Sequence, residues 1–224
     1  MTRYEIIQRC IEEEEGGWKY TDHPDDPDKG TYAGVRFITH ERYRERHGIP
    51  RINPDEYKRL AEINHPALQQ EIIEVYEDFF WDVMRLDHVP NYLRAMVFSA
   101  GVNRGTENGI LYLQKTANDF AKQYHNMHDI PYTPIKEDGI MGAITMGLVN
   151  NYLTVNTGLM RKNIAIKYFY HWQQSYNKLV VDNAKAWKEF ATPTDKFATK
   201  PKYFRATFLE GWFNRAFKFI MEIE

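Results

Sequence analysis

The 224-residue sequence predicts a mainly α-helical fold, of the α+β class, with one small irregular or β element near the N-terminus. Apolar residues recur at helical spacing along most of the chain. Residues 17–36 differ, because they carry prolines, glycines and aspartates with few apolar side chains, a composition typical of loops and short hairpins. Hydrophobic residues make up 43% of the chain, which is enough to bury one large core or two small ones.

The first helix is predicted over residues 3–15. Its apolar side consists of Tyr4, Ile7, Cys10 and Ile11. Gly16-Gly17 then ends the helix, since glycine is favoured where a helix stops. Cys10 is the chain's only cysteine, so there is no internal disulfide framework. Its place in the apolar pattern predicts a buried structural thiol.

Further helix-start signals follow along the chain. They are Thr39, which can cap a short helix ending near Gly48, and then Asn53-Pro54, His65-Pro66 and Pro90. The segment LRAMVFSAGV after Pro90 is apolar almost all round, which predicts the central buried helix. Later helices are predicted at 106–123, 141–151, 158–189 and 203–222, with a loop over 125–139.

The sequence lacks the marks of a membrane-spanning or secreted chain. No apolar run approaches the roughly 20 residues that span a bilayer. The start turns acidic within a dozen residues and has no apolar core typical of a secretory signal. We therefore expect synthesis and folding in the cytoplasm, without a signal peptide and without membrane insertion.

The net charge of −2 conceals an uneven distribution. Residues 161–219 hold 12 Lys/Arg and 4 Asp/Glu, whereas the rest of the chain holds 17 basic and 27 acidic residues. A basic segment attracts anionic polymers such as nucleic acid or cell wall. A helical surface with interspersed lysines gives the same count, so charge alone does not identify a partner.

Four consecutive glutamates precede the double glycine in the stretch EEEEGGW. Helical phase turns Glu14 and Glu15 toward the apolar side and leaves Glu12 and Glu13 outward. The negative end of the helix dipole and partial burial both raise the pKa of an inward carboxyl. Such a group suits a general acid, whereas a solvated, frayed helix end is the alternative. Periodicity does not choose between Glu14 and Glu15.

The loop after the glycines supplies partners for this acid. Its polar residues are Asp22, Asp25, Asp26, Asp28 and Thr31. An acid at a helix end followed by an Asp and a Thr suits glycoside hydrolysis, in which loop groups hold water or stabilise positive charge on the sugar. The same aspartates suit turns, and the EF-hand spacing for calcium is absent. No HExxH, GxSxG, P-loop or GxGxxG motif occurs, so we expect no metal or organic cofactor.

Several segments resemble glycoside hydrolase family 108, in the same order along the chain. They are EGGW, DPDKGTYAGV, FFWDVMRLDHVP and FSAGVNRGTENGILYLQ. EDGIMGAIT and FLEGWFNRAFKFI are similar to the peptidoglycan-binding segment that follows in that family. The resemblance implies a lysozyme-like fold, with a muramidase region over 1–104 and a helical, peptidoglycan-binding-type region over 105–224 in the same single domain. It favours a helix-start turn over a ligand site for Asp138-Gly139 and Gly142.

The resemblance also implies site residues. The glutamate directly before the glycine pair is Glu15, and the family's Asp-Pro and later Thr match Asp26 and Thr31. Trp81 and Asn103 match further motif positions, for which structural and substrate-binding roles are both open. The candidates for sugar stacking are Trp18, Tyr20 and Tyr32, although core packing is the more frequent fate of such residues.

This sequence departs from the family pattern at three positions. The spacing from Glu15 to Asp26 is about two residues longer than usual, and Asp28-Lys29 replaces a double glycine, which weakens the assignment of Asp26. Ser99 replaces an Asp before the VN-x-G motif, and that change bears on packing.

The function that the resemblance implies is an endolysin-type N-acetylmuramidase. It would cleave the β-1,4 bond between N-acetylmuramic acid and N-acetylglucosamine in the peptidoglycan glycan strand, without nucleic acid as a partner. It would reach the cell wall or periplasm by holin-dependent or non-classical release. The alternatives are a non-catalytic cell-wall-binding or secretion-helper protein on the same scaffold, and a lytic transglycosylase, which also uses one glutamate.

Overall fold

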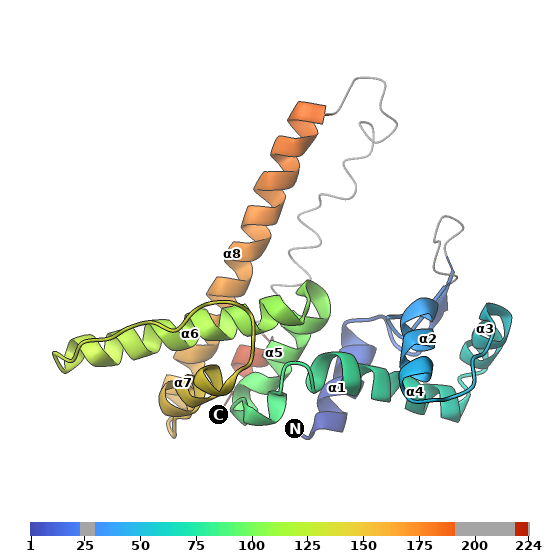
Figure 1. Cartoon of the computed structure of the whole chain (residues 1–224), viewed down its shortest axis with the longest axis horizontal. Coiled ribbons are helices and arrows are strands. Elements are labelled where there is room, and N and C mark those ends of the chain that lie inside the picture. Colours follow the sequence, from blue (N-terminus) through green and yellow to red (C-terminus); the bar gives the residue numbers. More distant parts are fainter. Residues whose placement is uncertain (23–29, 191–217, 224) are drawn as a thin grey trace. The chain divides into compact units, whose positions relative to one another are not determined.

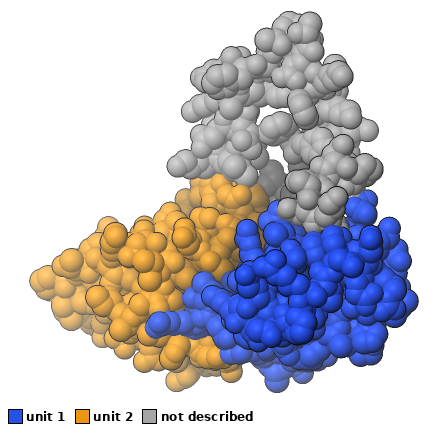
Figure 2. All heavy atoms as spheres, turned by 45° about the vertical axis from the view of Figure 1, so that its right-hand side comes forward, with its two compact units in different colours: residues 1–86 blue, residues 87–224 orange. Residues whose placement is uncertain are grey.

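The computed structural model describes residues 1–22, 30–190 and 218–223 (Figure 1). The chain forms two compact units, residues 1–86 and residues 87–224, which Figure 2 shows in blue and orange. Asp26 and most of the predicted helix 203–222 lie outside the described residues, although residues 218–221 are helical. Among the described helices, none is both long enough and apolar enough to cross a bilayer.

The first unit combines helices with a small sheet in its described part. In chain order its elements are α1 (Arg3–Glu13), β1 (Tyr20–Thr21), β2 (Thr31–Tyr32), β3 (Val35–Arg36), α2 (Phe37–Arg46), α3 (Pro54–Glu62), α4 (Pro66–Tyr76) and the π-helical turn η1 (Glu77–Trp81). The antiparallel sheet has the order β1-β2-β3. The predicted β element near the N-terminus is therefore confirmed.

Helix α1 begins with a capping box and buries one side. Thr2 Oγ1 accepts a hydrogen bond from Glu5 N at 3.2 Å, and Glu5 Oε2 accepts one from Thr2 N at 2.7 Å. The buried side consists of Ile6, Ile7, Cys10 and Ile11, so the buried position predicted for the thiol is confirmed. The prediction for Tyr4 is wrong: its side chain is 55% exposed, because the apolar side is centred on Ile6 and Cys10.

Helix α2 begins before the predicted cap at Thr39. Its N-cap is Arg36, the last residue of β3, so the strand passes directly into the helix. Phe37 N donates to Gly30 O at 3.0 Å, and the Phe37 side chain is buried, which fixes this earlier start. Helices α3 and α4 begin as predicted, at Pro54 and Pro66.

The described part of the second unit is helical. A 3₁₀ turn (Leu86–His88) joins the units, and α5 (Asn91–Arg104), α6 (Thr106–Met127), α7 (Ala143–Leu153) and α8 (Gly158–Phe190) follow. Helix α5 buries most of its length, as predicted for the central helix, and packs against α6 and α8. Because α5 packs with the helices after it, the compact units do not coincide with the predicted regions 1–104 and 105–224.

Helix α6 extends four residues beyond its predicted end, and the chain after it runs back along the helix (Figure 1). The last turn is held by His125, whose ring hydrogen-bonds to Pro131 O at 3.0 Å and to the Tyr152 hydroxyl at 2.8 Å. Asn118 then binds the returning chain, through bonds to both Ile135 N and Ile135 O at 3.1 Å. These long-range contacts are not visible in helical periodicity.

The Asp138-Gly139 motif is a turn that α6 holds in place before α7. The buried Gln114 accepts from Gly139 N at 2.8 Å, and its amide nitrogen donates to Asp138 Oδ1 and Thr145 Oγ1, each at 3.0 Å. Gly139 has a φ of 72°, and a Cβ there would lie 2.6 Å from the Glu107 carbonyl oxygen. Gly142 is the N-cap of α7. The motif thus forms the helix-start turn that the sequence favoured over a ligand site.

Replacement of Gln114 by alanine is expected to destabilise the second unit by about 2–3 kcal/mol, because the buried Gly139 N–H and its neighbours lose their partner. Urea unfolding monitored by circular dichroism measures this loss. Gln123→Ala is the control, since Gln123 lies on the same helix with an exposed side chain and is expected to change stability by less than about 0.5 kcal/mol. Equal effects of the two substitutions would contradict a structural role for Gln114.

An ion cluster between α6 and α8 is expected to make the second unit less stable in acid. Asp119 Oδ2 accepts from Lys167 Nζ and His171 Nε2, each at 2.9 Å. Burial opposes the charge of Asp119, but these two bonds outweigh burial and lower the pKa of its carboxyl. Burial lowers the pKa of His171 below 6.5, against the attraction of Asp119. The unfolded chain therefore binds protons at a higher pH than the folded chain does at both sites.

The contribution of His171 to the free energy of unfolding is therefore fully present above pH 6.5. It is lost as the pH falls from 6.5 toward the lowered pKa of His171, by up to about 1.4 kcal/mol per pH unit. Asp119 contributes in the same sense below pH 3.8. Hydrogen exchange of the α6 and α8 amides at pH 7.5 and 5.5 measures the first step. His171→Gln is expected to flatten it, whereas His128→Gln, at an exposed position, is expected to leave it unchanged. An unchanged pH dependence in His171→Gln would contradict this assignment.

Candidate active site

The end of α1 places Glu15 at the edge of the first unit's core. The amide nitrogens of Glu14 and Glu15 both donate to Cys10 O, at 2.9 and 3.1 Å, and Gly17 N donates to Ile11 O at 2.8 Å. Gly16 and Gly17 have φ values of +83° and +81°, which glycine adopts without steric cost. The double glycine therefore ends the helix by conformation, and the chain turns away directly after Glu15.

Burial divides the four glutamates as helical phase predicts. Glu12 and Glu13 are exposed, whereas Glu14 and Glu15 are half-buried. The two inward carboxyls also act on the same buried neighbour, Tyr76, which lies in their electrostatic field. The structure thus excludes a frayed, fully solvated end for the last two members of the run.

The Glu15 carboxyl rests on the turn between β2 and β3. A Cβ placed on Gly34 would lie 2.5 Å from Glu15 Oε2 and 2.5 Å from the Tyr76 hydroxyl oxygen. The Glu15 and Tyr76 oxygens therefore lie close to each other, on the same side of the Gly34 backbone. Gly34 also has a φ of +78°. Both facts require glycine at this position. The Glu15 carboxyl therefore occupies the space that the side chain of any other residue at position 34 would need.

Two buried tyrosine hydroxyls hold the β2–β3 turn by hydrogen bonds to its backbone carbonyls. The Tyr76 hydroxyl donates to Ala33 O at 2.8 Å, and the Tyr57 hydroxyl donates to Val35 O at 2.9 Å. Both rings are buried. Burial raises the pKa of Tyr76 well above its usual range, and its electrostatic interactions with Cys10, Glu15 and Glu14 act in the same direction. Tyr76 therefore stays neutral and remains a hydrogen-bond donor beside Glu15.

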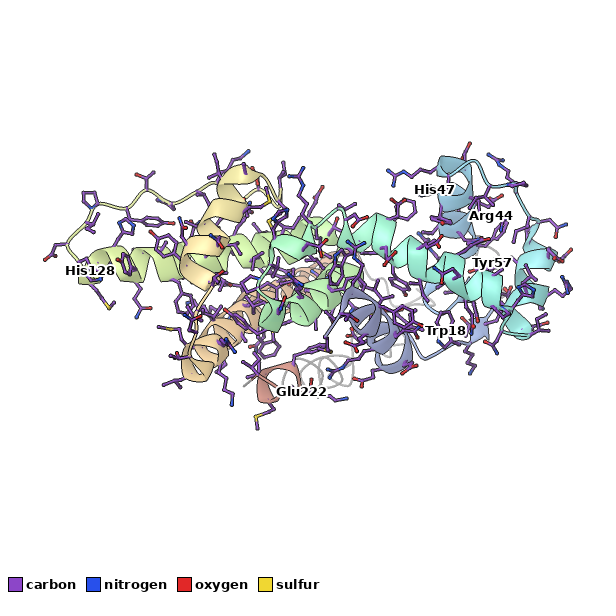
Figure 3. All side chains as sticks on the ribbon, turned by 90° about the horizontal axis from the view of Figure 1, so that it is seen from below. Trp18, Arg44, His47, Tyr57, His128 and Glu222 are labelled. Atoms are coloured by element: carbon purple, nitrogen blue, oxygen red, sulfur yellow. The ribbon has the colours of Figure 1, made fainter. Side chains whose placement is uncertain are left out.

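Helix α4, which carries Tyr76, is tied to α2 by a half-buried ion pair between Glu71 and Arg44. Glu71 accepts from Arg44 Nη1 with both carboxylate oxygens, at 2.9 and 2.8 Å, and from His40 Nε2 at 2.7 Å. Burial opposes the charge on Glu71, but the bonds from His40 and Arg44 outweigh it and lower the pKa of this carboxyl. Figure 3 labels Arg44 on α2. These contacts hold α4 and hence the position of the Tyr76 hydroxyl.

Thr31 lies on the same hairpin as Gly34. It is half-buried at the start of β2, opposite Thr21 on β1 and Arg36 on β3. Side chains alternate along a strand, so Thr31 faces away from the buried side that Tyr32 occupies. Asp26 lies outside the described residues, and its predicted role stays a prediction.

The predicted sugar-stacking aromatics divide by burial. Trp18 and Tyr20 are half-buried, and Figure 3 labels Trp18 in the first unit. The Tyr20 ring lies 6.4 Å from the Tyr57 ring, and Lys58 Nζ lies 5.7 Å from its centroid. Tyr32 is fully buried, and its hydroxyl donates to Asn64 Oδ1 at 2.8 Å, which favours core packing for this residue.

Trp81 and Asn103 have structural surroundings as well. Trp81 is 1% exposed, and the Arg3 guanidinium carbon lies 5.3 Å from its ring centroid. Asn103 is half-buried on α5 in the second unit, and its side-chain nitrogen donates to Ser99 O at 2.9 Å. Both observations favour packing roles, and a substrate-binding role stays a prediction.

Sequence reasoning missed the two residues that position the Glu15 carboxyl most directly. Gly34 appeared only within the segment DPDKGTYAGV that resembles the family, and Tyr76 was not singled out. A buried tyrosine needs a partner for its hydroxyl, which is the signal available in the sequence, but the identity of that partner depends on the tertiary fold. Within the described residues, no group of three or more His, Cys, Asp or Glu side chains could hold a metal ion.

The helices and the small antiparallel sheet, with Glu15 resting on the turn of that sheet, form a mainly α, lysozyme-like fold. The model of the glycosyl hydrolase 108 family matches residues 8–105, which include Glu15, the sheet, Tyr76 and α5. The resemblance seen in the sequence is thereby confirmed over these residues, which match the model of this family.

The solved structure of Brucella abortus SagA is similar in fold. It has 17% sequence identity to this chain and a TM-score of 0.53, and the match covers 98% of this chain and 92% of that one. At this identity the similarity shows the fold alone. No curated protein gives a significant match to the chain.

Proposed function

We propose that the protein is a peptidoglycan hydrolase, an N-acetylmuramidase that cleaves the β-1,4 bond between N-acetylmuramic acid and N-acetylglucosamine. The observation that carries the proposal is the position of the Glu15 carboxyl. It is half-buried and lies against the main chain at Gly34, inside the segment that matches the glycosyl hydrolase model. The match to the glycosyl hydrolase model supports a glycosidase, and we propose the particular bond and the particular acid.

In this mechanism Glu15 protonates the glycosidic oxygen as the bond to the anomeric carbon breaks. The carboxyl lies at a helix C-terminus and beside a second carboxyl, Glu14, and both features favour its protonated form before the reaction. The buried Tyr76 hydroxyl donates to Ala33 O and keeps the turn rigid, so the acid does not have to be repositioned in each turnover.

The second half of the reaction needs a group that orients water or stabilises the oxocarbenium-like transition state. Thr31 and Asp26 are the residues proposed for it, because they follow the acid on the loop and hairpin of the same unit. Water attack on the anomeric carbon then gives a new reducing end and returns the proton to solvent or to Glu15.

The deciding experiment is mass spectrometry of the fragments released from purified peptidoglycan. A muramidase leaves N-acetylmuramic acid with a free reducing end, which borohydride reduces with a gain of two hydrogens. A lytic transglycosylase leaves a 1,6-anhydro sugar, 18 mass units lighter and inert to borohydride. Release of anhydro products, or of no fragments at all by correctly folded protein, overturns the proposal. The second result would favour a non-catalytic cell-wall-binding or secretion-helper role.

The site of action follows from the substrate. We propose that the protein is made in the cytoplasm and meets peptidoglycan only after holin-dependent or non-classical release. Fractionation of producing cells, with and without membrane permeabilisation, tests this: lysis is expected only when the membrane barrier is opened.

A further inference from the structure

The second unit carries a hollowed apolar surface where α6 packs against α7 and α8, and none of the proposed catalytic residues belongs to it (Figure 1). Two adjoining hollows, of about 510 and 560 Å³, lie in this surface and share Phe120, Gln123 and Asn163. We call the large apolar side chains that α6 and α8 contribute to the lining the α6–α8 patch. They are Phe120, Tyr124, Met127, Met160, Ile166 and Tyr170.

Most of the α6–α8 patch is exposed, although its side chains are of kinds that proteins usually bury. Met127 is 68% exposed, and Ile166 and Tyr170 are exposed as well. Leu159 is 74% exposed and lies on the same side of α8, seven positions before Ile166 and eleven before Tyr170. A contiguous exposed surface of aliphatic, aromatic and methionine side chains usually marks a site of interaction.

The charged groups of the lining are one acid and one base. Of the described residues that line the two hollows, only Asp119 and Lys167 are ionised, and Asp119 Oδ2 lies 2.9 Å from Lys167 Nζ. Both side chains remain partly exposed to solvent. The lining therefore has no net charge, which gives neither a polyanion nor a polycation an electrostatic advantage.

A balanced pair of opposite charges is complementary to a second copy of itself. In a two-fold symmetric interface, residue i of one protomer faces residue j of its partner, and residue j faces residue i. When Lys167 of one protomer faces the partner's Asp119, the second pairing follows by symmetry. The projecting side chains of Leu159 and Met127 lie on the same surface as the hollows, so each protomer can fill hollows of the other. The flexible thioethers of Met127 and Met160 adapt to an irregular hollow.

Other occupants fit this surface less well. A bilayer would bring hydrocarbon against the side-chain amides of Gln123, Asn151 and Asn163, which would lose their hydrogen bonds to water. An extended peptide adds to the edge of a sheet, but the described part of the second unit is helical. A charged amphipathic helix of another protein gains no attraction from a lining without net charge. Facing amides of two protomers, in contrast, can donate to and accept from each other.

From these observations we propose that the α6–α8 patch is an interface between two copies of this chain, related by a two-fold axis that places Lys167 opposite the partner's Asp119. The dimer goes beyond the proposed function and does not depend on which bond Glu15 cleaves. Failure of either proposal therefore leaves the other standing. A dimer carries two copies of the Glu15 site, so on a polymeric substrate it can engage at two points and dissociate more slowly.

The test is sedimentation velocity of the full chain near neutral pH, at concentrations from about 1 µM to about 100 µM, where specific interfaces of modest size associate. The mass is expected to rise from that of one chain toward that of two. A mass of one chain throughout this range overturns the proposal. A mass that continues to rise past two chains shows open, head-to-tail association and overturns the two-fold arrangement.

Ile166→Asp locates the interface. It places a charge in the middle of the patch at an exposed position and is expected to raise the dissociation constant of the dimer about tenfold or more. Ile144→Asp is the matched control, because Ile144 is equally exposed on α7 but lines neither hollow. It is expected to change the dissociation constant less than about twofold. Equal effects of the two substitutions would overturn the assignment to this patch.

An exchange of charges tests the pairing across the axis. Asp119→Lys alone places four positive charges at the interface and Lys167→Asp alone places four negative ones, and each is expected to weaken self-association about fivefold or more. A mixture of the two variants pairs lysine with aspartate across the axis again. Native mass spectrometry of the mixture is therefore expected to show the heterodimer above either homodimer. A mixture that associates no better than the separate variants would overturn this pairing.

Two further probes distinguish other occupants of the patch. They are vesicles of phosphatidylglycerol and phosphatidylethanolamine, and a synthetic amphipathic helical peptide with leucines at every third or fourth position. A chain that stays monomeric but binds either probe, and loses that binding in Ile166→Asp, overturns the proposal. The patch would then be a membrane surface or a groove for a helix of another protein.

Discussion

Replacement of Glu15 by glutamine is expected to reduce the release of reducing ends from peptidoglycan by about 10²-fold to 10⁴-fold, the range typical for loss of a general acid. Glutamine has nearly the same shape and fits the same seat on Gly34, but it has no proton to give to the leaving oxygen. The folded structure and thermal unfolding are therefore expected to change little. Initial rates of reducing-end formation, with unfolding monitored in parallel, measure both quantities.

Two neighbouring substitutions serve as matched controls. Glu12→Gln alters the same side chain on the exposed side of α1 and is expected to leave the rate within about twofold of the original. Glu14→Gln tests the second inward carboxyl, which contributes charge near Tyr76 but does not contact Gly34 in the manner of Glu15. If Glu14→Gln abolishes hydrolysis while Glu15→Gln retains it, the general acid has been assigned to the wrong residue.

Replacement of Gly34 by alanine is expected to damage both stability and catalysis. A methyl group there would meet Glu15 Oε2 and the Tyr76 hydroxyl at 2.5 Å, and the φ of +78° is unfavourable for alanine. Backbone strain of about 1 kcal/mol and overpacking of about 1–3 kcal/mol are expected to add. Displacement of the carboxyl by about 1 Å is expected to lower hydrolysis by about 10²-fold.

Gly48→Ala isolates the collision from the backbone strain. Gly48 has a φ of +65°, but a Cβ there would meet nothing within 4 Å. Its substitution is therefore expected to cost only the backbone term, about 1 kcal/mol, with hydrolysis retained. Urea unfolding and initial rates of both variants give the comparison. Equal rates for the two variants would show that the Glu15 seat does not matter for catalysis.

The sequence was sufficient to predict which glutamates point inward, because helical phase is a local property. Ile7 and Ile11 define the buried side of α1, and Glu14 and Glu15, which follow the helix end at Glu13, are half-buried as their spacing to those residues predicts. The choice of Glu15 over Glu14 needed the double glycine and the family resemblance. The structure adds a physical reason, since the Glu15 carboxyl is the one placed on Gly34.

The other contacts that position the Glu15 carboxyl could not be predicted from local sequence patterns. Tyr76 reaches Ala33 O across 43 positions of sequence, and Tyr57 reaches Val35 O across 22. No periodicity links residues at such separations, because the contact exists only after α3 and α4 have packed against the hairpin.

The predicted start of α2 and the predicted end of α6 were wrong for the same reason. The early start of α2 depends on the bond from Phe37 N to Gly30 O, and the late end of α6 depends on His125 contacts with the returning chain. A side-chain cap such as Thr39 is a local preference, and here the tertiary contacts of the hairpin outweigh it. The starts at Pro54 and Pro66 were predictable because proline in the first turn acts locally.

The backbone contact that positions the Glu15 carboxyl has a consequence for which residues of this protein can change in evolution. The wall that positions the carboxyl is built from peptide groups of the β2–β3 turn, and phenols from α3 and α4 hold it from the buried side. Arg36, an exposed side chain of the hairpin, can therefore be exchanged without moving that wall. Sequence change at exposed positions of the hairpin is therefore compatible with an unchanged position of the Glu15 carboxyl.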